Sequence, residues 1–373
     1  MQAVAFSAEC HMEDLSGRRI VEIGDKPFIK RALPDQVTYF STWPDDDMRI
    51  PSPDGSRVVS PGALGTLWRE LREPETSLVV CHPTFSSPWH WRWITRALFD
   101  RRVLHRSSSF LRAMGPQALR WRLAAPIAIV DHEDLPVINC NNFFLLDRCR
   151  IYFKRELPPD RWRLFLKTGH ANLPTPRFRE GARYQARIAK LRPISLGLPL
   201  SAPTSSLVES TEKSVDIFFA GRIEGSSSLR RRGLSELLAL CEQRGVVVDV
   251  AERLPQADFY RRCGRAWLTW SPEGLGWDCF RHYEAAMCGS VPLINQPTIE
   301  RHRPLLQGTH AIYYDVDEGG LTRAVVAALA DKPRLAAMGR AARAHVLAHH
   351  TPTALARHIV RTSIDPSGLG DCR

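Results

Sequence analysis

The sequence contains no long hydrophobic run. None of its apolar stretches approaches the ~20 consecutive residues that a helix needs to span a bilayer. Residues 1–11 also lack a basic region ahead of an apolar block, so we expect no signal peptide. These absences predict a cytoplasmic protein and leave room only for peripheral contact at the inner face of a membrane.

Paired cysteine motifs are missing as well. The nine cysteines are an odd number, with no Cys-x-x-Cys pair and no Cys/His ladder at zinc spacing. Buried thiols in a reducing compartment account for this pattern better than disulfides or metal ligands. The sequence therefore predicts no metal site and no cofactor.

Lysine is scarce, because only seven of the 51 basic residues are lysine and the rest are arginine. The planar guanidinium of arginine suits the recognition of phosphate. The net charge of +11 is spread along the chain rather than gathered in a tail. A polyanionic partner or an anionic membrane surface is allowed by this balance but not required by it.

Strand-like and helix-like segments alternate in both halves of the chain. This pattern predicts an α/β fold with two Rossmann-like domains in series that face a cleft. We expect a first domain over residues 1–200, a Pro/Ser-rich linker over 201–212, a second domain over 213–350, and a final helix within 351–373 that packs back on the first domain. The expected strands lie at residues 18–23, 36–40, 77–81, 103–105, 126–130, 150–153, 192–196, 215–220, 246–250, 266–270, 291–294 and 312–314, and the expected helices at 64–71, 91–99, 110–123, 233–242, 255–262, 320–330, 333–347 and 352–362.

The segment over residues 270–294 carries the most chemical information. A loop with Gly274 and Gly276 leads into a helical run with Arg281 and Glu284, which Gly289 is placed to end. Loop amides and a helix N-terminus attract phosphate, Arg281 adds a cation, and Glu284 can accept hydrogen bonds from a ribose diol. The alternative is a weak helical ion pair between Arg281 and Glu284. The combination suits a sugar nucleotide.

A second group lies at the end of the strand over residues 215–220. Gly221 would let a ligand approach the backbone, and Arg222 with Arg230 could clamp a diphosphate. The arginines at 230–232 could instead be the solvated start of a helix.

Residues 215–347 resemble the donor-binding domain of GT-B glycosyltransferases, with similarity to the CgeB-like, exostosin-like and group 1 members. The shared features are a strand followed by Ala-Gly-Arg, an arginine-rich helix entry, and Arg-x-x-Glu-Ala before Gly-x-x-Pro. Group 1 members place two glutamates eight positions apart, whereas Glu273 and Glu284 are eleven apart here. The resemblance implies a nucleotide-sugar-binding second domain in which Glu284 holds the ribose.

The first half offers an acidic cluster directly after the buried strand at 126–130. Asp131, His132 or Asp134 could act as a general base toward a sugar hydroxyl, with Glu133 between them. Similar transferases carry such a segment, followed by one like Tyr-Phe-Lys-Arg-Glu-Leu. Three further candidates for the acceptor or phosphate side are Lys154, Arg155 and the loop histidine His170. A helix N-cap, an ion pair between Arg155 and Glu156, and metal ligation of the cluster are the alternatives.

Tryptophans beside arginines recur at residues 88–93, 120–122 and 161–163. Such residues pack as half-buried positions, face an acceptor or a membrane, or grip single-stranded nucleic acid, and nucleic acid is the least expected of these. The sequence thus predicts a metal-independent glycosyltransferase that moves a sugar from a nucleotide-diphosphate-sugar to a hydroxyl of a saccharide, lipid-linked or protein acceptor. A sugar-nucleotide epimerase or phosphorylase, or a non-catalytic protein that binds a polyanion or membrane surface, remains open.

Overall fold

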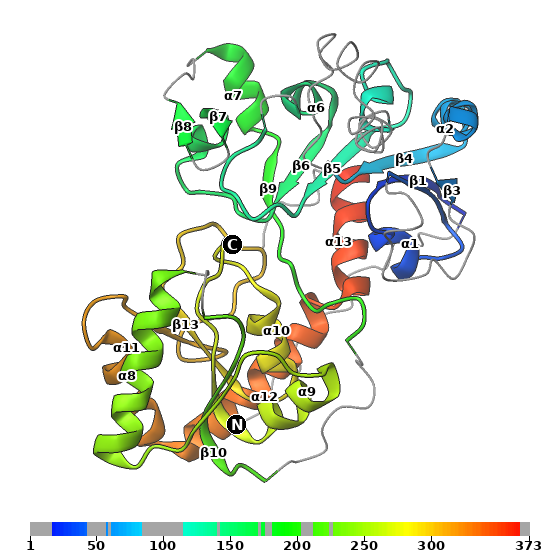
Figure 1. Cartoon of the computed structure of the whole chain (residues 1–373). Coiled ribbons are helices and arrows are strands. Elements are labelled where there is room, and N and C mark those ends of the chain that lie inside the picture. Colours follow the sequence, from blue (N-terminus) through cyan, green and yellow to red (C-terminus); the bar gives the residue numbers. More distant parts are fainter. Residues whose placement is uncertain are drawn as a thin grey trace, which may run out of the picture.

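The computed structural model describes residues 17–42, 57–58, 61–83, 115–139, 142–170, 173–175, 181–202, 212–223 and 227–365. Two separate parallel sheets dominate it, one above the other in Figure 1, and each is flanked by helices. The predicted α/β class with two Rossmann-like domains in series is confirmed.

The first sheet has seven strands in the described part of the chain, in the order β3-β2-β1-β4-β5-β6-β9. All neighbours pair in parallel. Its central strands are buried on both faces, which explains why they read as continuous apolar runs. The strands are β1 (Arg19–Gly24), β2 (Val37–Ser41), β3 (Arg57–Val58), β4 (Thr76–Cys81), β5 (Ile127–Asp131), β6 (Ile151–Lys154) and β9 (Leu191–Pro193).

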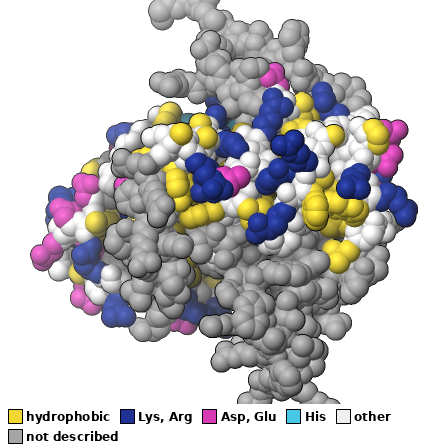
Figure 2. Space-filling view, turned by 90° about the horizontal axis from the view of Figure 1, so that it is seen from above, with side chains coloured by type: hydrophobic (Ala, Val, Ile, Leu, Met, Phe, Trp, Pro, Cys, Tyr) yellow, Lys and Arg dark blue, Asp and Glu magenta, His cyan; other side chains and the backbone are white. Residues whose placement is uncertain are grey.

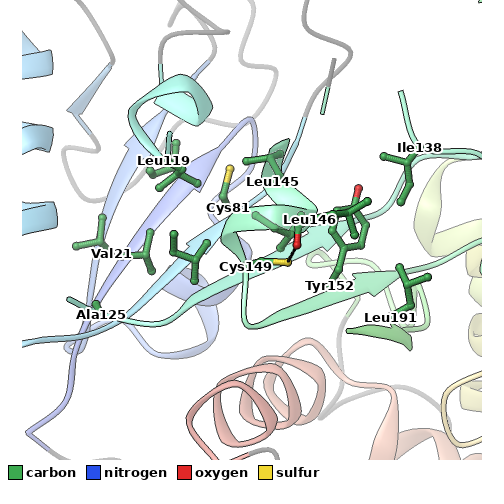
Figure 3. Packing of buried hydrophobic residues seen from close by; sticks show 14 of the residues in the cluster. Val21, Cys81, Leu119, Ala125, Ile138, Leu145, Leu146, Cys149, Tyr152 and Leu191 are labelled. Atoms are coloured by element: carbon green, nitrogen blue, oxygen red, sulfur yellow. Dashed lines mark hydrogen bonds between the residues drawn. The ribbon is translucent and has the colours of Figure 1, made fainter. Parts of the chain in front are cut away.

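Hydrophobic side chains cover both faces of this sheet. On one face, residues of β1, β4 and β6 pack against α6, as Figure 3 shows for Val21, Cys81, Leu145, Leu146 and Tyr152. On the other face, the sheet packs against α1 and the last helix of the chain. The helices of this domain are α1 (Phe28–Ala32), α2 (Pro61–Arg72), α6 (Phe143–Arg148), the short 3-10 helix η3 (Arg161–Phe165) and α7 (Ala182–Ile188), and a hairpin of β7 (Lys167–His170) and β8 (Leu173–Thr175) lies beside α7.

The second sheet has five parallel strands in the order β11-β10-β12-β13-β14. Gly289 has φ +68 directly after α10, so it ends that helix in the left-handed conformation as the sequence predicted. The elements are β10 (Val215–Ala220), α8 (Ser228–Arg244), β11 (Val248–Ala251), α9 (Gln256–Gly264), β12 (Ala266–Trp270), α10 (Phe280–Met287), β13 (Val291–Asn295), β14 (Ile312–Tyr314), α11 (Gly320–Leu329) and α12 (Lys332–His349).

Helix α8 begins five residues before its predicted start at Gly233. A Cβ on Gly233 would lie 2.3 Å from Trp270 Cζ2, so this glycine lets the indole ring pack against the helix. It marks a close contact inside the helix rather than the helix boundary.

The last helix, α13 (Pro352–Ile364), returns from the second domain to the first (Figure 1). Its Leu355, Ile359 and Val360 are fully buried in the core formed with Ile20 and Leu78. The two domains are therefore joined by packing at the C-terminal end as well as by the segment around residue 200.

Several expected elements lie outside the described residues, namely those at 91–99 and 103–105, residues 110–114 of the helix expected at 110–123, and most of the 201–212 linker. The hairpin and the helices α1, α6 and α7 were not predicted. In the described ranges, no helix combines the length and the apolar character that crossing a bilayer requires.

Candidate active site

A cavity of about 620 Å³ lies between the two domains. From the first domain it is lined by residues that follow the carboxyl ends of strands, including Lys26, His82 and His132. From the second domain it is lined by the loop at 274–280, which follows β12. The carboxyl ends of parallel strands are where open α/β sheets bind their ligands, so this cavity is the candidate site.

The loop that forms the second wall is held by the first domain. Glu156 accepts hydrogen bonds from the backbone N–H of Trp277 at 3.0 Å and of Asp278 at 2.9 Å. Asp278 accepts one from the N–H of Leu196 at 2.6 Å. A Cβ on Gly276 would lie 2.6 Å from the Glu156 carboxylate, so glycine is needed for this approach. The loop is therefore fixed in place across the domain boundary.

Arg281 lies in the first turn of α10 and points at the end of β10. Its Nε donates to the carbonyl of Ala220 at 3.0 Å, and its guanidinium lies 4.9 Å from the centre of the Phe219 ring. A Cβ on Gly221 would lie 2.4 Å from Arg281 Nη2. In the described part of the chain, Arg281 Nη1 is buried without a hydrogen-bond partner. A buried charged donor without a partner is costly, so the site favours an anion there.

Arg230 brings a second cation to the same place. Its Nε donates to the carbonyl of Glu273 and its Nη1 to the carbonyl of Arg222, each at 3.0 Å. Burial and the nearby charge of Arg281 lower the pKa of Arg230. The described hydrogen bonds of both arginines are to neutral carbonyl oxygens, so their repulsion would be relieved by a bound diphosphate.

Arg222 contributes differently from what we expected. Its side chain is exposed, and its carbonyl oxygen is the atom that joins the cluster. Gly274 lies close to the site, because a Cβ there would be 3.0 Å from Arg230 Nη2. The structure thus brings Gly221, Arg230, Gly274 and Arg281 together and leaves the Arg222 side chain outside the described contacts. Of these residues only Gly274 lines the cavity, so the arginine pair lies behind the loop at 274–280.

Glu284 lies one turn after Arg281 on α10 and is held by Tyr260, whose hydroxyl donates to Oε1 at 3.1 Å. Burial raises the pKa of Glu284 to about 7 and outweighs the Tyr260 hydrogen bond and the Arg281 charge. Glu273, by contrast, accepts a hydrogen bond from the Asn295 side chain at 3.1 Å. Glu284 therefore lies close to Arg281, whereas Glu273 is the carboxylate whose charge acts on Arg230.

A cysteine and a histidine that were not among the predicted site residues lie at the start of α10. His282 Nε2 donates to the carbonyl of Trp277 at 2.9 Å, and Nδ1 lies 2.7 Å from Ser271 Oγ and 3.6 Å from Cys279 Sγ. Burial raises the pKa of the Cys279 thiol, but His282 first and then Arg281 and Ser271 outweigh it and lower that pKa to about 6. Cys279 lines the cavity, and its lowered pKa favours the thiolate form at neutral pH.

The contacts of the acidic cluster in the first domain differ from those expected for a general base at Asp131. Asp131 is only 4% exposed, and it accepts hydrogen bonds from Tyr152 Oη at 2.7 Å and Lys154 Nζ at 3.0 Å. It also accepts one from the N–H of Glu133 at 3.0 Å. Neither Asp131 nor Lys154 lines the cavity. The two form an ion pair inside the domain, so their placement supports neither a catalytic Asp131 nor a Lys154 that faces phosphate.

The neighbouring residues do line the cavity. Arg155 forms ion pairs with Asp134 and Glu156, and its Nη1 donates to the carbonyl of His132 at 2.9 Å. Burial lowers the pKa of His132 far below its ordinary value, so its ring is neutral. Burial, and then the charge of Asp131, raise the pKa of Glu133 to about 7. No helix begins at this cluster, so the N-cap alternative is wrong, whereas the Arg155–Glu156 ion pair is present.

Two other predicted features lie away from the cavity. His170 ends strand β7, and Figure 1 places that hairpin beside α7 at the outer edge of the first domain. Trp121 is 64% exposed and packs edge-on against Trp68 at 5.9 Å. Figure 2 looks down on this outer end of the first domain, where basic side chains lie among hydrophobic ones. Trp162 packs edge-on against Phe165, whereas Trp121 stays largely exposed, and the segment at 88–93 lies outside the described residues.

One pair at the cavity was missed by sequence reasoning. His82 follows β4 directly and its Nε2 bonds to Glu22 Oε1 at 2.8 Å. The rule that drew attention to Asp131, a polar residue after a buried strand, applies equally to His82. Within the described ranges, no three His, Cys, Asp or Glu side chains are grouped so that they could hold a metal ion.

Two Rossmann-like domains with a cavity between their strand ends define the GT-B class of fold. Among solved structures, the chain is similar to an α-glucosyltransferase in complex with UDP-glucose and DNA containing an abasic site, with a TM-score of 0.55 and 8% identity over 93% of this chain and 99% of that one. It is also similar to sucrose-phosphate synthase from Thermosynechococcus elongatus, with a TM-score of 0.50 and 12% identity over 92% and 98% of the two chains. Identities this low establish the fold alone.

A family comparison finds a similarity in the second half of the chain. Residues 241–361 match the family model described as "Glycosyl transferase-like". No curated protein sequence matches the chain. The predicted resemblance to GT-B glycosyltransferases is confirmed by the fold and by this match.

Proposed function

We propose that this protein is a glycosyltransferase that binds a nucleotide-diphosphate-sugar in the second domain and transfers the sugar to an acceptor hydroxyl presented by the first. The observation that carries the proposal is the buried Nη1 of Arg281, which has no partner among the described residues and lies beside Arg230. A diphosphate supplies the missing acceptor oxygens and the missing negative charge. The family match of residues 241–361 supports the same conclusion.

The roles of the donor-site residues follow from their chemistry. Arg281 and Arg230 would hold the diphosphate, whose negative charge increases as the sugar leaves, so they stabilise the transition state more than the ground state. Glu284, oriented by Tyr260, would accept hydrogen bonds from the ribose hydroxyls. The N-terminus of α10 faces the cavity through Cys279 and adds a favourable dipole for an anion.

The donor is a co-substrate, and we propose that no cofactor takes part. Because the two arginines can supply the positive charge at the leaving group, we expect turnover to persist in the presence of EDTA. The acceptor that we propose is a saccharide or a lipid-linked saccharide. The α-glucosyltransferase to which the fold is similar was solved with UDP-glucose, which makes uridine donors the first to test.

A panel of nucleotides and sugar nucleotides tested by thermal shift addresses this proposal directly. A ligand at roughly 100 times its dissociation constant adds about 2.7 kcal/mol of stability, which such a scan detects. We expect one nucleoside diphosphate and its sugar ester to stabilise the chain and the matching monophosphate to do so less. Stabilisation by none of them would contradict the proposal, and conversion of the donor to its epimer without an acceptor would favour the epimerase.

A further inference from the structure

The cavity wall of the first domain contains a buried carboxylate and a histidine that have no part in the donor site. Glu22 lies on β1 and is completely buried. Its Oε1 accepts from the N–H of Ile29 and its Oε2 from the N–H of Lys30, both at 2.8 Å, and Oε1 also contacts His82 Nε2 at 2.8 Å. Both oxygens accept N–H donors, as a carboxylate does, so Glu22 is held rigidly and faces His82 rather than the cavity.

His82 is placed between this carboxylate and the cavity. Its backbone N–H donates to the carbonyl of Ile23 at 2.8 Å, and a Cβ on Gly24 would lie 2.8 Å from two atoms of the His82 side chain. Glycine at position 24 therefore makes room for the ring. Since a carboxylate only accepts, Nε2 carries the proton, and Nδ1 keeps its lone pair. Among the described contacts Nδ1 has no hydrogen-bond partner.

We propose that His82 is the general base that deprotonates the acceptor hydroxyl, with Glu22 as its positioning residue. This inference rests on the proposed glycosyl transfer. The acceptor oxygen attacks the anomeric carbon while its proton passes to His82 Nδ1. The bond between that carbon and the diphosphate oxygen breaks, and its electron pair stays on the diphosphate. Glu22 stabilises the imidazolium, which then releases the proton to solvent, and direct displacement inverts the anomeric configuration.

The other groups on this wall are less suited to the task. Asp134 is occupied by its ion pair with Arg155, and Asp131, which lies behind the wall, by its ion pair with Lys154. Besides Asp134 and Arg155, the charged and titratable groups that share the wall with His82 are Asp25, Lys26, His132 and Glu133. Of these, Glu133 is the competing base, because its carboxyl lines the same cavity and can ionise near neutral pH.

The test uses the full chain and separates binding from turnover. Turnover is the release of nucleotide from the donor, with water or a supplied hydroxyl as the acceptor, so it does not depend on knowing the natural acceptor. We expect His82→Asn to bind the donor like the wild type and to lose a factor on the order of 10² to 10⁴ in kcat. The matched control is His345→Asn. His345 also forms a hydrogen bond, to the carbonyl of Arg303 at 2.9 Å, but it lies on α12 and does not line the cavity.

A split between kcat and KM identifies Glu22 as a positioning residue rather than a structural one. Glu22→Gln removes the charge that stabilises the imidazolium in the transition state, so kcat should fall while the KM for the donor stays unchanged. A purely structural role would lower Tm and change kcat and KM together. In ¹⁵N NMR, the Nε2–H tautomer of His82 should dominate in the wild type, because Glu22 only accepts, and a dominant Nδ1–H tautomer would contradict the proposal without any measurement of turnover.

The outcomes distinguish the two proposals. Absence of donor binding in the wild type would overturn the glycosyltransferase proposal and this inference with it. Donor binding with full turnover in His82→Asn, or a loss confined to Glu133→Gln, would overturn only the role of His82. A product with retained anomeric configuration would also overturn the role of His82 and leave the glycosyltransferase proposal standing.

Discussion

The charged side chains at the strand ends are paired with opposite charges in the first domain and lie beside like charges in the second. In the first domain these groups are paired with each other, as Lys154 is with Asp131 and His82 is with Glu22. In the second domain, Arg230 and Arg281 lie close together and bond to carbonyl oxygens, with one buried nitrogen left without a partner. These two pairs satisfy each other's charge without a ligand, although the uncharged His132 Nε2 on the same wall is also buried without a partner among the described residues. The arginine pair of the second domain, in contrast, is completed by an anion.

The charged pairs of the first domain are expected to contribute to stability, and the two arginines of the second domain to ligand binding. Buried pairs that satisfy each other hold a domain together or orient a reactive group, and removing one member leaves an unpaired buried charge. Cations that repel each other in the free protein contribute little to its stability and much to ligand binding. Each of the predictions below tests one side of this contrast.

The largest expected effect is on the stability of the first domain. Lys154→Met leaves the Asp131 carboxylate buried without its cation, so the free energy of unfolding should fall by about 3–5 kcal/mol. The double variant Asp131→Asn/Lys154→Met should recover much of this loss. Urea unfolding of the wild type, Lys154→Met and the double variant measures these free energies. A loss below about 1 kcal/mol in Lys154→Met would mean that the ion pair does not stabilise the domain.

In the second domain we expect the opposite result, a large loss of ligand affinity with little loss of stability. Arg281→Ala should weaken binding of the nucleotide-sugar by about 100-fold, about 2.7 kcal/mol, and change the free energy of unfolding by less than about 1 kcal/mol. Titration calorimetry and urea unfolding together measure both. The control is Arg261→Ala, since Arg261 forms an exposed pair with Asp258 at 3.0 Å on α9. Equal losses of affinity in the two variants would contradict the assignment.

A smaller effect follows from the pKa of Glu284. This pKa is raised to about 7, and the ribose hydroxyls need the ionised acceptor, so binding is strongest above that pH and weakens as the pH falls through it. One pH unit below the pKa, about a tenth of the carboxyl is ionised, so affinity should fall about tenfold between pH 8 and pH 6.

The ligand for this titration is a sugar nucleotide rather than a free nucleoside diphosphate. The terminal phosphate of the latter titrates near a pKa of about 6 and would confuse the result. Glu284→Gln should bind more weakly and show a flat profile. A wild-type profile as flat as that of the variant would show that Glu284 does not contact the ribose.

The smallest effect concerns the thiol at the cavity. With a pKa of about 6, Cys279 should react with iodoacetamide at a rate that is already maximal near pH 7. Bound nucleotide should slow that reaction several-fold, because Cys279 lines the cavity. Site-resolved mass spectrometry can compare it with the exposed Cys241. If the nucleotide protected both cysteines equally, Cys279 would not report on the donor site.

The fold was largely predictable, because strands buried on both faces appear in the sequence as short apolar runs. Val215–Ala220 and Ala266–Trp270 were predicted with their observed bounds. Helix α8 was cut short because Gly233 looks like a boundary in sequence, whereas its role is to admit the Trp270 ring, a contact between distant residues.

The candidate site was predictable only where its residues are close in sequence. Arg281 and Glu284 lie one turn apart on one helix, and Gly221 ends a recognisable strand. The partners that decide function come from elsewhere in the chain. Lys154 satisfies Asp131 through the register of β5 and β6, and His82 meets Glu22 across sixty residues. Local patterns identify candidates, but the pairing of strands determines which of them remain free.

A crystal structure with a nucleoside diphosphate bound tests the central claim most directly. We predict that Arg281 Nη1 donates to a diphosphate oxygen, with Arg230 on the same group and Glu284 on the ribose. A nucleotide bound elsewhere, or an Arg281 Nη1 still without a partner in the complex, would contradict the account.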